Sequence, residues 1–146
     1  MSTIVGTNIE VTNIKFDSDT TSMIISNAGQ VTVQGENTAT TNLQQGLCKW
    51  WIKYSQDAGS GSQNLDSFNV SSVTDVETGR FDPTYSSNMN NANYCVSVMH
   101  QAELTNADST EYTVGQATNT TQLRTVENGV LRDKGNANAF AVGDLA

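Results

Sequence analysis

Basic residues are scarce in this sequence. Its 146 residues include 7 Lys and Arg against 15 Asp and Glu, which leaves a formal net charge of −8. A chain with this balance repels a phosphate backbone, and no basic patch offsets the repulsion. The composition therefore excludes nucleic-acid binding by charge, and it suits the surface of a soluble particle.

Cysteines are few and long apolar runs are missing. Cys48 and Cys95 stand far apart without a CxxC spacing, so we expect buried free thiols and neither a disulfide framework nor a metal knuckle. No window approaches the roughly 20 apolar residues of a membrane span, and no cofactor motif is present. The N-terminus lacks the features of a signal peptide, so we expect synthesis in the cytoplasm without secretory export.

Long helix-forming runs are also missing, and the chain has one proline. Ser, Thr and Asn make up about a third of the residues, whereas charged residues make up 15%. Short hydroxyl and β-branched side chains favour strands and turns, and the low charge density argues against disorder. The sequence therefore predicts an all-β fold.

The C-terminal two thirds, residues 47–146, are predicted to form an antiparallel β-sandwich head. Apolar and polar residues alternate over Ser67–Asp75, with a slip at Ser71–Ser72 that indicates a bulge. The turn Val76–Gly79 then returns the chain as a hairpin. The expected strands span residues 47–54, 66–75, 80–87, 93–100, 111–116, 122–127 and 138–142.

The N-terminal segment, residues 1–35, contains short apolar stretches but too few apolar residues to close a core. Such a segment is stable only against something else, most simply copies of itself. We therefore predict a short, intertwined, trimeric β-structured stem, followed by a linker at residues 36–46. The alternative is that these strands complete the downstream sheet of the same chain. The residues assigned to particle anchoring and trimerisation are Ile4, Val5, Ile9, Val11, Ile14, Phe16, Ile24 and Val31.

Several segments carry a resemblance to known proteins. In the C-terminal part they are residues 49–54, 67–75, 79–81, 89–94, 123–129 and 138–142, and residues 1–4 and 23–33 are similar to the short opening that often precedes the same domain. Their order is similar to that in a family of bacteriophage tail-fibre-like domains. The motif Ser-Phe-Asn-Val-Ser-Ser at residues 67–72 is the most specific part of the resemblance, which covers most of the chain.

The resemblance implies a virion structural protein without enzymatic activity. It implies a homotrimeric fibre on the particle surface, a tail fibre or receptor-binding appendage for host adhesion. The implied partners are other phage structural proteins at the N-terminus and a glycan or protein of the host surface, with no membrane insertion. The alternative is a capsid decoration or head-fibre protein with an architectural role.

Two residues depart from the family pattern. Trp50 stands where a small residue is usual, so Trp51 is the better match to the family's tryptophan. Pro83 replaces an apolar strand residue, which predicts an edge strand or a bulge because proline cannot donate to a sheet ladder. The residues expected in the head core are Trp51, Phe68, Val70, Val73, Phe81, Tyr94 and Val96.

Neighbouring tryptophans on a strand point to opposite faces, so one of Trp50 and Trp51 must lie outside the core. An aromatic residue outside the core can stack on sugars or contact a neighbouring subunit, and the sequence favours the subunit contact. The candidates for recognition or interface contacts are Trp50, Tyr54, Asn90 and Asn91. No catalytic or metal-binding residue is expected, and the single histidine, His100, is assigned to a strand end.

Overall fold

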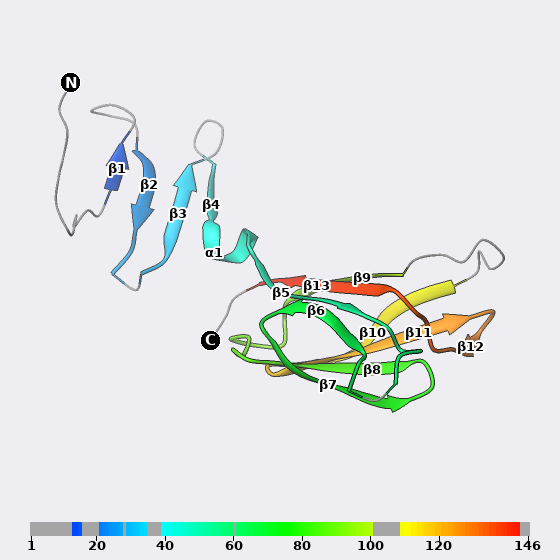
Figure 1. The fold of residues 1–146 in the computed structure, drawn as a ribbon. Helices are drawn as coiled ribbons and strands as arrows, with labels where there is room; N and C mark the ends of the chain where they lie inside the picture. The colour runs from blue at the N-terminus through cyan, green and yellow to red at the C-terminus, as the bar shows by residue number, and fades with distance from the viewer. Residues whose placement is uncertain are drawn as a thin grey trace, which may run out of the picture. The chain divides into compact units, whose positions relative to one another are not determined.

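The computed structural model describes residues 13–15, 21–27, 29–34, 39–59, 61–100 and 109–143. The described chain is all-β, as predicted, with three antiparallel sheets and one helix of four residues. It divides into a first unit, Met1–Gly46, and a second unit, Leu47–Ala146. Figure 1 shows one sheet in the first unit and two layers in the second.

The first unit is an antiparallel sheet in the order β1-β2-β3-β4. Its strands are β1 (Asn13–Lys15), β2 (Thr21–Ile25), β3 (Val31–Gln34) and β4 (Thr40–Asn42), followed by helix α1 (Leu43–Gly46). In the described chain these strands pair only with one another, so they do not complete a sheet of the second unit. The proposed anchoring residues Ile4, Val5, Ile9, Val11 and Phe16 lie outside the described residues.

The predicted linker at residues 36–46 was wrong in its described part, which carries β4 and α1. Gln44 attaches the helix to the sheet, because its Oε1 accepts from Val31 N at 2.9 Å and its Nε2 donates to Gly29 O at 3.1 Å. The Asn42 side chain caps the helix by accepting from Gln45 N at 3.2 Å. The polar segment at residues 39–46 is thus held in place by the side chains of Gln44 and Asn42, although its sequence has no strand or helix periodicity.

The second unit is a sandwich of two antiparallel sheets, ordered β6-β5-β13-β9 and β10-β11-β8-β7, with β12 added beside β11. The bounds are β5 (Cys48–Tyr54), β6 (Asn64–Phe68), β7 (Val70–Glu77), β8 (Arg80–Tyr85), β9 (Cys95–His100), β10 (Ser109–Ala117), β11 (Thr120–Glu127), β12 (Val130–Leu131) and β13 (Ala137–Val142). The predicted hairpin is confirmed as β7 and β8, including a bulge between Val70 and Ser72.

Asn69 divides the strand that was predicted over residues 66–75. The chain leaves β6 of one sheet and enters β7 of the other at this residue, whose φ is 57°. Its Nδ2 donates to Lys49 O and to Ser87 O, both at 3.0 Å, and its Oδ1 accepts from Ser87 N at 2.7 Å. Asparagine tolerates this left-handed conformation, and its amide bonds to backbone groups of β5 and of the segment that follows β8.

The core lies between the two sheets and is rich in aromatic rings. Trp50 stacks on Tyr85 with ring centroids 5.1 Å apart, and Tyr54 stacks on Phe81 at 4.4 Å. Each stack joins β5 of one sheet to β8 of the other. The buried hydrophobic residues are Trp50, Ile52, Tyr54, Phe81, Tyr85, Met89, Tyr94, Leu123, Ala137, Ala139 and Ala141.

The core assignment needs correction at four aromatic residues. Trp51 is 37% exposed and Phe68 is 53% exposed, so neither belongs to the core. Trp50 and Tyr54, expected to make recognition or interface contacts, are fully buried. Trp50, Ile52 and Tyr54 share the inner face because residues two apart on a strand share a face. The remaining expected core residues are Phe81 and Tyr94, which are buried, and Val70, Val73 and Val96, which are half-buried against the core.

Of the two alternatives predicted for Pro83, an edge strand or a bulge, the edge strand is wrong. Pro83 is buried in β8, which lies between β7 and β11. The β8–β11 ladder pairs Thr84 with Thr120 and Phe81 with Leu123, without pairs between them. The Thr120 hydroxyl donates to Pro83 O at 2.7 Å. The ladder is therefore interrupted opposite the proline, while the strand remains internal.

Candidate interaction surfaces

The outer face of the β6-β5-β13-β9 sheet carries an aromatic row. Backbone pairing places Phe68 opposite Trp51, and Trp51 opposite Phe140. Directly paired residues of antiparallel strands point to the same face, so the three rings lie side by side across three strands. Each is more than one third exposed. We call Phe68, Trp51 and Phe140 the aromatic row.

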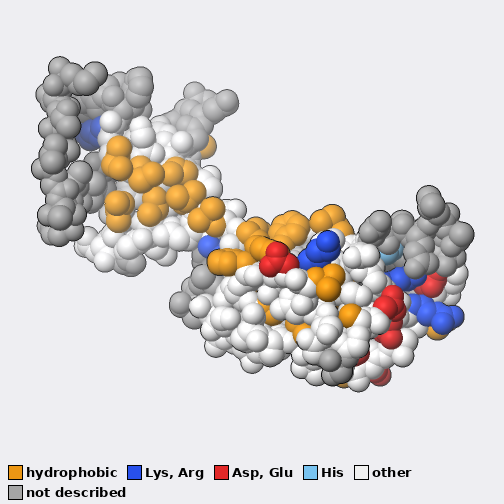
Figure 2. Space-filling view, in the orientation of Figure 1, with side chains coloured by type: hydrophobic (Ala, Val, Ile, Leu, Met, Phe, Trp, Pro, Cys, Tyr) orange, Lys and Arg blue, Asp and Glu red, His pale blue; other side chains and the backbone are white. Residues whose placement is uncertain are grey.

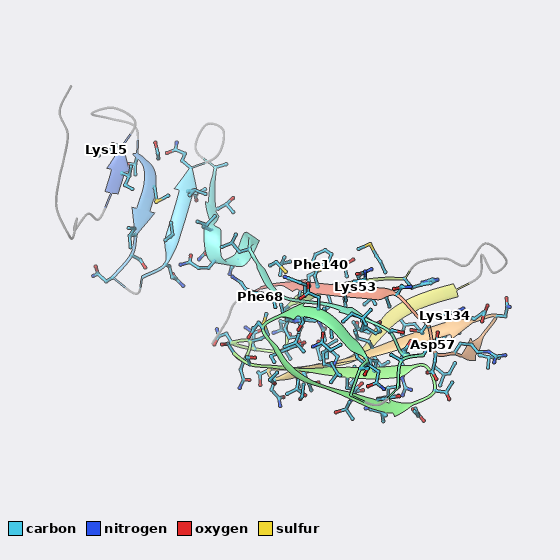
Figure 3. The ribbon with its side chains drawn as sticks, in the orientation of Figure 1. Lys15, Lys53, Asp57, Phe68, Lys134 and Phe140 are labelled. Atoms are coloured by element: carbon cyan, nitrogen blue, oxygen red, sulfur yellow. The ribbon has the colours of Figure 1, made fainter. Side chains whose placement is uncertain are left out.

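A polar row runs beside the aromatic row on the same face. Asp66 is paired with Lys53, and Lys53 with Asn138. These three residues precede or follow the aromatic row by two positions on their strands, which keeps their side chains on the outer face. Figure 3 shows Phe68, Lys53 and Phe140 along β6, β5 and β13, and Figure 2 shows hydrophobic side chains there beside charged ones.

The two cysteines belong to this outer face, and the prediction of buried thiols was wrong. Both are exposed, and both are backbone partners of Val142, one on each side. Two strand spacings separate their Cα atoms by about 10 Å, which is too far for a disulfide within the chain. Cys48 Sγ donates to Trp50 O at 3.1 Å.

The outer face of the second sheet of the sandwich is different in character. It carries the ion pairs Arg80–Asp82 at 2.8 Å and Arg124–Glu77 at 2.6 Å. The Arg124 guanidinium, through its hydrogen bond and its charge, holds the pKa of Glu77 below its usual range. Charged side chains on this face pair with one another, whereas the aromatic row on the opposite face exposes apolar surface.

The first unit also has an apolar face, formed by Ile14, Met23, Ile25, Val31 and Val33. Met23 is paired with both Ile14 and Val33, and Ile25 with Val31, so the five side chains point to one side of the sheet. We call these residues the stem face. No described side chain of the first unit is buried. Ile24, expected among the anchoring residues, pairs with Thr32 on the opposite face and is 43% exposed.

Gln56 joins the loops at one end of the second unit. Its Oε1 accepts from Thr125 Oγ1 and from Lys134 N, both at 3.1 Å, and its backbone N donates to Lys134 O at 2.8 Å. Lys134 Nζ lies 3.3 Å from Glu127 Oε2. Figure 3 labels Lys134 in this region. These contacts tie chain segments together, so we assign the cluster a structural role.

The remaining candidates are polar residues at strand ends and turns. His100 ends β9 and is half-buried, with Ala137 as its backbone partner. Asn90 and Asn91 are exposed, and Asn91 Oδ1 accepts from Asn93 N at 2.7 Å. Among the described residues, no three His, Cys, Asp or Glu side chains could together hold a metal ion. Nor do those residues include a helix long and apolar enough to cross a membrane.

The chain matches no family model, no curated protein sequence and no solved structure in the comparisons with known proteins.

Proposed function

We propose that the chain is a non-enzymatic structural protein of a bacteriophage particle that assembles into a homotrimeric fibre. The first unit anchors the fibre to other phage structural proteins and holds three chains together. The second unit projects from the particle and binds the host surface. Two observations support the proposal: the sequence resemblance to tail-fibre-like domains, and the unburied stem face.

The stem face is the observation that carries the proposal. Four short strands in one layer can bury an apolar face only against a second layer. Of the stem face, Ile14 is 47% exposed and the other four side chains are half-buried. Three copies that bring their stem faces together supply the missing layer to one another, in a closed symmetric assembly.

The proposal is tested by the oligomeric state of the full-length protein with a charge placed on either side of β3. Val33→Asp puts a carboxylate on the stem face, and the matched control Thr32→Asp puts it on the opposite face. Light scattering after size-exclusion chromatography is expected to give three chains for the wild type and Thr32→Asp, and one chain for Val33→Asp. A monomeric wild type, or a trimeric Val33→Asp, would contradict the proposal.

The place on the particle needs a separate experiment. Antibody labelling of intact particles in the electron microscope is expected to mark the tail. Labelling on capsid faces or vertices would overturn the tail assignment in favour of capsid decoration, without affecting the trimer.

A further inference from the structure

We propose that the outer face of the β6-β5-β13-β9 sheet is a binding platform for a chain of neutral sugar units. This inference deepens the proposed adhesive role of the second unit and rests on it, because it names the chemistry of the host-surface ligand. The platform consists of the aromatic row Phe68, Trp51 and Phe140 and the polar row Asp66, Lys53 and Asn138.

The aromatic row has the shape that sugar stacking requires. Neighbouring strands lie about 4.8 Å apart, so Phe68 and Phe140 are separated by about 10 Å across the sheet. This is about the length of two pyranose rings in an extended chain. None of the ring contacts among the described residues involves these three side chains, so their π-systems have no aromatic partner. Such rings are free to meet the apolar C–H face of a sugar.

The polar row supplies hydrogen-bonding groups at the edge of the aromatic row. A sugar hydroxyl both donates and accepts, and Asp66, Lys53 and Asn138 together offer a carboxylate acceptor, an ammonium donor and an amide. Asp66 Oδ1 already accepts from Ser67 N at 2.9 Å. In the described structure, the Lys53 and Asn138 side chains are engaged in no hydrogen bond or ion pair.

The same row argues against a second copy of the chain as the occupant. Interfaces between proteins are depleted of charged residues at their centres, whereas Asp66 and Lys53 stand directly beside the rings of this face. The five residues of the stem face, by contrast, include no charged side chain. This face of the second unit therefore suits a ligand that has both polar groups and apolar surfaces. A saccharide has both, in its hydroxyl groups and in the C–H faces of its rings.

The charge of the protein restricts the class of saccharide. The net charge of −8 repels an anionic polymer such as a sulfated or uronic-acid polysaccharide. A neutral chain of hexoses or N-acetylhexosamines does not meet this repulsion.

The test uses full-length protein and an array of immobilised neutral oligosaccharides built from glucose, galactose, mannose and N-acetylhexosamine units. The wild type is expected to bind at least one of them. Trp51→Ala and Phe140→Ala should each weaken that binding about tenfold or more, as expected when a central aromatic contact is truncated. The matched control is Tyr112→Ala, which removes an exposed ring from β10 in the other sheet and should leave binding unchanged.

Tryptophan fluorescence gives a second measurement on the same proteins. Trp50 is buried and Trp51 is exposed, so the bound oligosaccharide should shift the emission of Trp51 and leave that of Trp50 unchanged. Trp51→Phe, which keeps a ring, should retain most of the binding. Far-UV circular dichroism checks that each variant is folded.

The proposal is overturned if the wild type binds no neutral oligosaccharide, or if Trp51→Ala and Phe140→Ala both bind as the wild type does. A smaller oligomer in Trp51→Ala, together with unchanged sugar binding, would identify the face as a subunit interface. The monomeric variant Val33→Asp should still bind a single oligosaccharide, so failure of trimerisation and failure of sugar binding are distinguishable.

Discussion

The two units of this chain are built from the same kind of amphipathic strand but differ in burial. Among the described residues, eleven hydrophobic ones are buried in the second unit and no side chain is buried in the first. In the second unit, the apolar inner face of each sheet is covered by the other sheet of the same chain. The first unit has one sheet, and its stem face has no such cover among the described strands. The comparison shows that alternation of apolar and polar residues predicts a strand. It does not predict whether a second layer buries the apolar face of that strand.

The largest expected effect comes from the two tryptophans of β5. Trp50→Ala should lower the free energy of unfolding of the second unit by about 3–5 kcal/mol, because it removes a buried ring that stacks on Tyr85. Trp51→Ala, one residue away, should cost less, about 1–2 kcal/mol, because its ring is 37% exposed and contributes only cross-strand contacts to Phe68 and Phe140. Urea unfolding followed by far-UV circular dichroism measures both. Equal losses would show that the two faces of the sheet are not different in burial.

Two glycines in hairpin turns provide the next comparison. Gly79 and Gly129 have φ values of 72° and 77°. A Cβ at Gly79 would lie 2.7 Å from Thr125 O and 2.8 Å from Arg132 N, whereas a Cβ at Gly129 meets nothing within 4 Å. Gly79→Ala should therefore cost about 2–4 kcal/mol from strain and displaced backbone, and Gly129→Ala about 1 kcal/mol from φ alone. The same urea unfolding measures both, and a reversed order would contradict the packing described for the β7–β8 turn.

A smaller loss is expected at the crossing between the two sheets. Asn69→Gly keeps the left-handed conformation but removes the three side-chain hydrogen bonds to Lys49 and Ser87, and it should cost about 1–3 kcal/mol. Asn69→Ala should cost about 1 kcal/mol more because alanine is strained at this φ. Thermal unfolding of both variants measures the difference. If Asn69→Gly is as stable as the wild type, the side chain does not hold the sheets together.

The smallest expected effect concerns Tyr85, whose ionisation changes the free energy of unfolding at high pH and not at neutral pH. Burial raises the pKa of Tyr85, so the folded state keeps its proton at a pH where the unfolded chain has lost it. The contribution of Tyr85 to the free energy of unfolding is complete below the ordinary tyrosine pKa of about 10. It falls as the pH rises above that value. All four tyrosines lie in the second unit, so the tyrosine effect is expected there. Urea midpoints measured from pH 7 to pH 11 should fall less steeply in Tyr85→Phe, and identical profiles would contradict this account.

Much of the fold was predictable because strand periodicity is local. Residues 47–54, 80–87 and 122–127 were assigned to strands from their local composition, and the turn at Val76–Gly79 marked the hairpin. The crossing at Asn69 was not predictable from period two, because one left-handed residue moved the following strand to the other sheet. Phe68 was therefore assigned to the core with Val70, although the two residues lie in different sheets.

The outer-face platform was less predictable from the sequence. Trp50 could have been placed correctly, since it alternates with Ile52 and Tyr54. Phe140, however, joins Trp51 through pairing between strands nearly ninety residues apart, and no local pattern specifies that register. The helix α1 was missed for a similar reason, because its attachment depends on Gln44 contacts with the turn before β3.

The central claim is that the first unit gains its stability from assembly, and amide hydrogen exchange in the full-length protein tests it most directly. In the wild type, the amides of β2 and β3 should be protected from exchange together with those of β5 and β13. In Val33→Asp, protection should disappear from β2 and β3 and remain in β5 and β13, because only the second unit has a core of its own. Protected β2 and β3 amides in a monomeric protein would contradict the account.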